Sequence, residues 1–390
     1  MNLLSARRGM LRLLVPLAVA AVVVGGVAFA SATRSDSATP SLPPRTAEQL
    51  LAEVSQARTP GLSGTVVQTA RLGLPELPGL GGRGGVSLTD LLSGSHSVRV
   101  WLKGEDKSRL AVTVPLAESD AIHNGRDLWL YSSQDNNVVH YRLAGNGKAG
   151  TASPPQTGAP ATPQELSRRL LAALSPTTEV TVERNLRVAG RDAYQVRLRP
   201  KAQESLIDSV VLAADGQTKV PLRVQIIAKG KQAPAFEVGF TQVQFRAPAD
   251  GVFEFTPPPR AKVTEKQPPS DGGHPGNGGG HPGNGGNARP PASSDAPAVL
   301  GSSWTSVVVA RDVNLDAGGS GSNGEATRQL LRAATPVQGA FGHGMLLRTT
   351  LLTVLLTDDG RLYAGAVTPS AIEAAAARPL SEAKPLGGGR

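Results

Sequence analysis

The sequence contains no cysteine among its 390 residues, and aromatic residues make up only 4% of it. The absence of cysteine excludes disulfides, thiol nucleophiles, thiolate zinc sites and a lipid attached at an N-terminal cysteine. Charged residues are also scarce at 18%, whereas 45 glycines and 31 prolines are present. This composition favours β-structure joined by flexible segments, and the length allows about two domains.

Motifs that support catalysis or metal binding are missing as well. Neither H-E-x-x-H nor G-x-S-x-G occurs, and His274 and His281 belong to a repeated "HPGNGG" segment. None of the six histidines comes with the defined partners that catalysis or a metal site requires. Of two G-x-G-x-x-G stretches, the first follows no strand. The second lies between a predicted strand and helix, as a phosphate loop would, but its surroundings are typical of antiparallel strands, which does not favour a nucleotide site. The sequence therefore predicts a protein that is not an enzyme and has no cofactor, metal site or nucleic-acid partner.

The N-terminus carries an export signal. Arg7, Arg8 and Arg12 precede an uncharged run over residues 13–33, which places the following chain outside the cytoplasm. Small residues favour cleavage near Ala30–Ala32, but the run is also long enough to stay as a transmembrane anchor. The net charge of +9 fits an anionic membrane surface and is equally ordinary for a soluble protein. These alternatives stay open.

Most of the remaining chain has the two-residue periodicity of short strands. Thr46 and Gln49 are spaced as a capping box, which predicts a helix over 46–57, and a leucine stripe predicts another over 163–174. An apolar Gly/Pro loop follows the first strand at 73–85, and Asp215-Gly216 predicts a turn between two strands. The expected organisation is an export segment (1–33), a β-rich domain (45–260), a disordered Gly/Pro/His linker (261–297) and a small C-terminal α+β module (298–378).

The stretch "IHNGRDLWLYSSQDNNVVHYRL" carries a family likeness. It resembles the strand–turn–strand signature of the LolA-like lipoprotein-carrier family, which includes the RseB-like sigma-factor regulators. Asn124, Gly125, Leu128, Trp129 and Tyr131 match that signature. Three further stretches are similar: "SGTVVQ", "VVLAADGQTKVPLRVQI" and "DGVFEFTPPP".

The resemblance implies an α+β fold, in which a curved antiparallel half-barrel over residues 45–260 is lidded by short helices above an apolar cavity. Strand periodicity gives candidate cavity residues, although it places Leu128 and Leu130 on the face opposite Trp129 and Tyr131. Burial of acyl chains there would be favourable at about 25 cal/mol per Å². The alternative is that the two helices simply fill the apolar face. The candidates are Val98, Val100, Leu102, Leu128, Trp129, Leu130, Tyr131, Val196, Leu198, Leu222, Val224, Ile226 and Phe240.

Two functions follow as hypotheses. The first is an extracytoplasmic carrier that holds lipid or a lipidated protein at a membrane surface, with the 73–85 loop and the helices acting as a lid. The second is an RseB-like envelope-stress regulator that contacts a membrane-bound regulator through its C-terminal module. The sequence predicts neither the lipid nor the role of the module.

Overall fold

The computed structural model describes residues 41–73, 93–114, 117–142, 176–266, 297–311, 313 and 330–385. The export segment, nearly all of the 73–85 loop, the helix expected at 163–174 and most of the linker lie outside these residues. Within the described ranges, no helix is long and apolar enough to cross a membrane.

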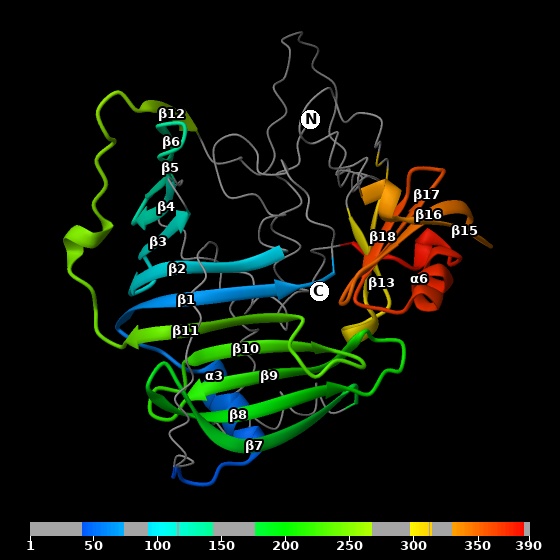
Figure 1. Ribbon diagram of the computed structural model, residues 1–390, viewed down its shortest axis with the longest axis horizontal. Coiled ribbons are helices and arrows are strands. Elements are labelled where there is room, and N and C mark those ends of the chain that lie inside the picture. The colour runs from blue at the N-terminus through cyan, green and yellow to red at the C-terminus, as the bar shows by residue number, and fades with distance from the viewer. Residues whose placement is uncertain are drawn as a thin grey trace, which may run out of the picture.

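The first sheet has twelve strands in the order β12-β6-β5-β4-β3-β2-β1-β11-β10-β9-β8-β7, with β12 and β7 at its free edges (Figure 1). Its neighbours pair antiparallel except for the parallel pair of β12 and β6. This open sheet, with few helices, confirms the predicted α+β class and antiparallel half-barrel. The strands are β1 (Gly61–Arg71), β2 (Ser93–Lys103), β3 (Lys107–Val114), β4 (Ala117–Asn124), β5 (Asp127–Ser132), β6 (Asn137–Arg142), β7 (Thr178–Val188), β8 (Arg191–Pro200), β9 (Ile207–Asp215), β10 (Pro221–Ala228), β11 (Phe236–Gln244) and β12 (Lys262–Lys266).

Register shifts bend the centre of this sheet. The β1–β11 pairing shifts between Thr65 and Val66, and the β9–β10 pairing shifts between Pro221 and Arg223. Such bulges bend a strand and increase its local twist. Gly64 allows the close approach, since a Cβ there would lie 2.4 Å from the Gln242 carbonyl oxygen.

Helix α3 (Ala47–Ser55) forms where the capping box predicts it. The Thr46 hydroxyl accepts from the Gln49 N–H at 3.3 Å, and the Gln49 side chain accepts from the Thr46 N–H at 3.1 Å. Leu50 is fully buried against Tyr194 and Val196 of β8. The helix therefore packs on one face of the sheet near its β7 edge.

Residues 252–258 alternate as strand residues do, but they do not form a strand. They include the end of a short 3-10 helix, η2 (Asp250–Phe253), and then irregular chain. Consecutive prolines from Pro257 cannot donate to a strand ladder. Phe253 is instead buried at 1% exposure, so the segment packs on the sheet through its aromatic side chains.

Strand β12 lies where the sequence predicts the start of the linker. It pairs with β6 in parallel, from Lys262 opposite Asn137 to Lys266 opposite Tyr141. His140 of β6 is 3% exposed, and its Nδ1 lies 2.8 Å from Glu265 Oε2 of β12. The strand has only one apolar residue, Val263, which is why its composition did not reveal it.

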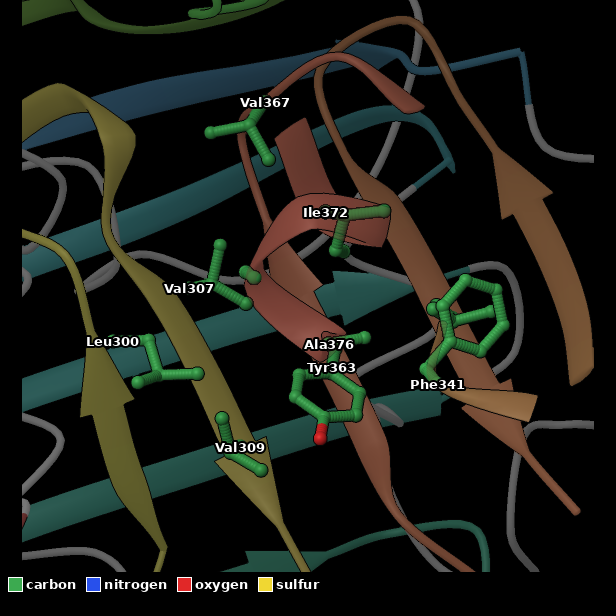
Figure 2. Close-up of a cluster of buried hydrophobic side chains, with 10 residues drawn as sticks. Leu300, Val307, Val309, Phe341, Tyr363, Val367, Ile372 and Ala376 are labelled. Carbon is green, nitrogen blue, oxygen red and sulfur yellow. The ribbon is translucent and has the colours of Figure 1, made fainter. Parts of the chain in front are cut away.

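The second sheet has seven strands in the order β15-β16-β17-β18-β14-β13-β19. One face packs against helix α6 (Pro369–Ala376): Figure 2 shows Ile372 and Ala376 over Val307, Val309 and Tyr363. The other elements are β13 (Ala298–Leu300), η3 (Ser303–Thr305), β14 (Val307–Ala310), β15 (Thr335–Gly339), β16 (Gly342–Arg348), β17 (Thr353–Thr357), β18 (Leu362–Gly365), η4 (Leu380–Glu382) and β19 (Lys384–Pro385).

Asp358 to Gly360 form the turn between β17 and β18, and the apolar run over residues 345–357 before this turn is not one strand. The chain turns over Thr349–Leu352, where the Thr349 hydroxyl accepts from the Leu352 N–H at 2.9 Å. A threonine hydroxyl can close a turn in this way within an apolar segment. The apolar run therefore supplies two neighbouring strands, β16 and β17.

Asp215, at the predicted turn between β9 and β10, makes folding dependent on pH. Burial alone would raise the pKa of its carboxyl group, but hydrogen bonds from Arg191 and Thr218 outweigh burial and hold the pKa below its usual value. A lowered pKa stabilises the folded state above the unfolded value of about 4, and this contribution is lost as pH falls through the lowered pKa. We expect the urea midpoint to stay level from pH 7 to 5 and to fall below pH 4. A midpoint that rises on acidification would contradict this.

Candidate functional site

The face that carries α3 is called the inner face. Strand register places alternate residues of each strand on it: Val100 of β2 lies opposite Gly64 of β1 and Leu110 of β3. On the other half of the sheet, Val224 of β10 lies opposite Val238 of β11. These side chains are buried or half-buried, and most belong to one apolar cluster. The inner face is thus apolar across the middle of the sheet.

A cavity of about 270 Å³ opens on this face. Its walls come from five adjacent strands, β3, β2, β1, β11 and β10, so the sheet must bend toward this side. Arg223 and Gly239 are directly paired and alternate with inward residues, so the Arg223 side chain points to the other face. Ser108, paired with Leu102, is a polar side chain on the inner side. The lining residues are Leu62, Val66, Val100, Leu102, Ser108, Leu110, Pro221, Leu222, Arg223, Val224, Val238, Gly239 and Phe240.

The structure brings five of the sequence candidates together around this cavity: Val100, Leu102, Leu222, Val224 and Phe240. Four more lie on the inner face beyond its walls: Val98, Val196, Leu198 and Ile226. Leu128 and Leu130 also point inward but sit on β5, and Leu130 is 38% exposed. The nine members of the first two groups form a continuous surface, whereas β5 lies to one side of it.

Trp129 and Tyr131 lie on the opposite, outer face. The Trp129 ring stacks on His140 with centroids 3.7 Å apart, and Phe255 packs against Trp129 at 5.5 Å and Tyr131 at 5.8 Å. These aromatics therefore hold the irregular segment after η2 against the sheet and do not line the cavity. The sequence alone could not assign them, because Phe255 is 124 residues from Tyr131.

His140 links three elements beneath this aromatic cluster. Its Nε2 lies 2.8 Å from Asp127 Oδ1, and its Nδ1 lies 2.8 Å from Glu265 Oε2. Both ring nitrogens are thus occupied by carboxylates of β5 and β12, which suits an imidazole with a structural role. In the described part of the chain, no group of three histidine, aspartate or glutamate side chains, this one included, is arranged to hold a metal ion.

Sequence reasoning missed several wall residues, among them Leu62, Val66, Leu110 and Val238. Their signal was the alternation itself: Leu62, Gly64 and Val66 recur every second residue on β1. Extending that alternation to every predicted strand would have found them. The pairing of β1 with β11 is needed to bring them together, and its paired residues are at least 166 positions apart in sequence.

A comparison with protein families finds a match, over part of the chain. Residues 87–265 match a family described as "Predicted periplasmic protein (DUF2092)", which agrees with the predicted extracytoplasmic location. No curated protein matches the chain.

Solved structures also match the chain, at low sequence identity. A Pseudomonas aeruginosa MucA/MucB complex matches at 16% identity and a TM-score of 0.41, covering 85% of this chain and 98% of that one. A LolA superfamily protein from Nitrosomonas europaea matches at 14% identity and a TM-score of 0.21, covering 54% of this chain and 99% of that one. An uncharacterised Thermus thermophilus protein matches at 11% identity and a TM-score of 0.33, covering 56% and 99%. At these values function must be argued from the site.

Proposed function

We propose that the protein is an extracytoplasmic binding protein that holds a lipid acyl chain, free or attached to a protein, in the cavity of the inner face. The observation that carries this proposal is the apolar lining of that 270 Å³ hollow. A polar metabolite would leave its hydrogen-bonding groups unpaired there, which costs free energy. An alkyl chain has no such groups.

The size of the cavity suits a chain of moderate length. At about 30 Å³ per water-sized group, the cavity holds roughly nine such groups. Burial of nine methylenes at about 0.8 kcal/mol each gives an upper limit of roughly 7 kcal/mol. This corresponds to a Kd on the order of 10 μM before the cost of association is subtracted. We therefore propose reversible binding, as a carrier needs.

The described parts of the chain fit a two-module arrangement in this proposal. The half-barrel within 45–260, extended by β12, would hold the ligand, and residues 298–378 would form the second module after the linker. The segment 1–33 would either anchor the protein or be cleaved near Ala30–Ala32. The mass of the protein purified from its natural host would decide between these two outcomes.

Native mass spectrometry after gentle extraction tests the function. We expect a co-purified lipid in stoichiometric amount, and we expect the delipidated chain to bind dodecanoate with a one-to-one, saturable isotherm and a Kd weaker than about 10 μM. The absence of both would reject acyl-chain binding.

A second candidate function, regulation by protein contact, is favoured by the other face of the second sheet. Residues that alternate with the α6-facing positions are apolar and half-buried: Val308, Met345, Leu347, Val354, Leu356, Leu362 and Ala364. A membrane-bound partner could bind this face. A stoichiometric membrane-protein partner found together with an empty cavity would support regulation over carrying.

A further inference from the structure

The apolar inner face continues beyond the cavity along the strands. On β10, Val224 lines the cavity and Ile226 is the next residue on the same face; on β11, Val238 is followed in the same direction by Phe236. A two-residue step along a strand covers about 7 Å. All four side chains belong to the apolar cluster that includes the cavity walls. The apolar surface therefore extends past the cavity on the side away from Leu62 and Leu102. We call the cavity together with this extension to Ile226 and Phe236 the trough.

Trp304 of the second module belongs to the same apolar cluster. Its indole is 9% exposed, and the cluster also contains Ile207, Ile226 and Phe236. Indole Nε1 donates to the Thr178 hydroxyl of β7 at 2.7 Å, and Thr178 is itself buried. The side chain is therefore fixed by a hydrogen bond on one side and by apolar contacts on the other.

The turn that presents Trp304 is also fixed. Gly301 and Ser303 have φ values of 78° and 56°, and a Cβ at Gly301 would lie 2.9 Å from the Thr305 carbonyl oxygen. The Ser303 hydroxyl donates to the Thr177 hydroxyl at 3.0 Å. The backbone thus holds the indole at one position relative to β7.

Backbone hydrogen bonds join the second module to this end of the first sheet. The Leu206 N–H donates to the Ala366 carbonyl at 2.9 Å, and the Thr368 N–H donates to the Glu204 carbonyl at 2.8 Å. The Thr350 N–H donates to the carbonyl of Leu72, just after β1, at 2.8 Å. Figure 1 shows the module beside these strand ends. These hydrogen bonds hold the second module, and with it Trp304, beside the first sheet.

We propose that Trp304 is the end wall of the binding trough and sets the length of the acyl chain it accepts. This inference rests on the proposed function. The apolar end at Ile226 and Phe236 would receive the methyl terminus, while the head group stays at the Leu62 and Leu102 end. Removing the indole would extend the trough by about 7 Å, or roughly five methylenes at the 1.5 Å bond length of a tetrahedral carbon chain.

Bromine quenching tests the placement in the unmodified chain, because bromine quenches a tryptophan that it touches. Trp101 and Trp129 lie on the outer face, so Trp304 is the tryptophan within reach of the trough. We expect 12-bromododecanoate to quench severalfold more fluorescence than 2-bromododecanoate, and Trp304→Phe to abolish the difference. Saturable binding with equal quenching by the two isomers would overturn the end-wall assignment.

A chain-length series tests the consequence. For Trp304→Ala, we expect the optimum among saturated fatty acids to move about four to five carbons longer, with Kd falling about fourfold for each added methylene that is buried. Trp304→Phe fills most of the same space, so it should move the optimum chain length by no more than about two carbons. If the wild type binds none of the series, the proposed function fails. If the wild type binds but Trp304→Ala keeps its optimum, only the end wall fails. If Trp304→Ala does not fold, as shown by the loss of its thermal unfolding transition, the bromine-quenching experiment on the unmodified chain tests the end wall instead.

Discussion

Asp215→Ala is expected to destabilise the protein by about 3–5 kcal/mol, the usual cost of leaving a buried charge without its partner. Asp215 is 1% exposed and accepts from Arg191 Nη2 at 3.1 Å, from the Thr218 N–H at 2.7 Å and from the Gln217 N–H at 3.1 Å. Alanine would leave both N–H groups without this acceptor, and the half-buried guanidinium would lose its carboxylate and keep the Gln217 side-chain oxygen at 3.3 Å. Such a loss is a large fraction of the roughly 5–15 kcal/mol that stabilises a typical domain.

Asp192→Ala is the matched control, since it breaks a neighbouring pair that is exposed. Arg187 Nε and Asp192 Oδ1 are 3.0 Å apart, with side chains 52% and 42% exposed. An exposed pair contributes about 1 kcal/mol or less. Urea unfolding of the wild type and both variants at pH 7 measures the difference. Equal losses for Asp192→Ala and Asp215→Ala would show that burial of this carboxylate does not decide its contribution.

Local signals predicted the elements whose geometry is fixed within a few residues. The capping box of Thr46 and Gln49 begins α3, and Asp215-Gly216 turns β9 into β10, because both depend on hydrogen bonds to nearby backbone groups. The alternation of Val98, Val100 and Leu102 likewise gave the correct inner face of β2. These are short-range consequences of residue type.

Contacts between segments that are far apart in the sequence determine the features that the sequence alone did not predict. Leu128 and Trp129 alternate equally well, and their faces are decided by the register of β5 with β4 and by Phe255, which packs on Trp129. Strand β12 has almost no apolar signal and is recognised by its pairing with β6. Trp304 looked like a residue of the second module, although its hydrogen-bond partner, Thr178, lies in the first sheet. Each case depends on a contact between segments more than 100 residues apart in sequence.

Val224→Asp is expected to weaken dodecanoate binding more than about 100-fold, because a carboxylate in an apolar wall brings water and opposes the buried chain. Val224 is 5% exposed and lines the cavity, and Ile226 is the next residue on the same face of β10. Titration calorimetry with dodecanoate, beside circular dichroism of the same sample, separates binding from folding. Where Val224→Asp does not fold, Leu102→Asp on the half-buried rim replaces it.

Val182→Asp is the control for this substitution, since it makes the same change on edge strand β7, where Val182 is 39% exposed and lines no part of the cavity. Substitutions at such positions change stability by about 0.5 kcal/mol or less, so dodecanoate affinity should stay within about twofold of the wild type. A folded Val224→Asp or Leu102→Asp that binds dodecanoate as tightly as Val182→Asp would place the ligand elsewhere. Loss confined to the trough variants, by contrast, requires the acyl chain to lie against β2 and β10, where the five-strand wall leaves room for it.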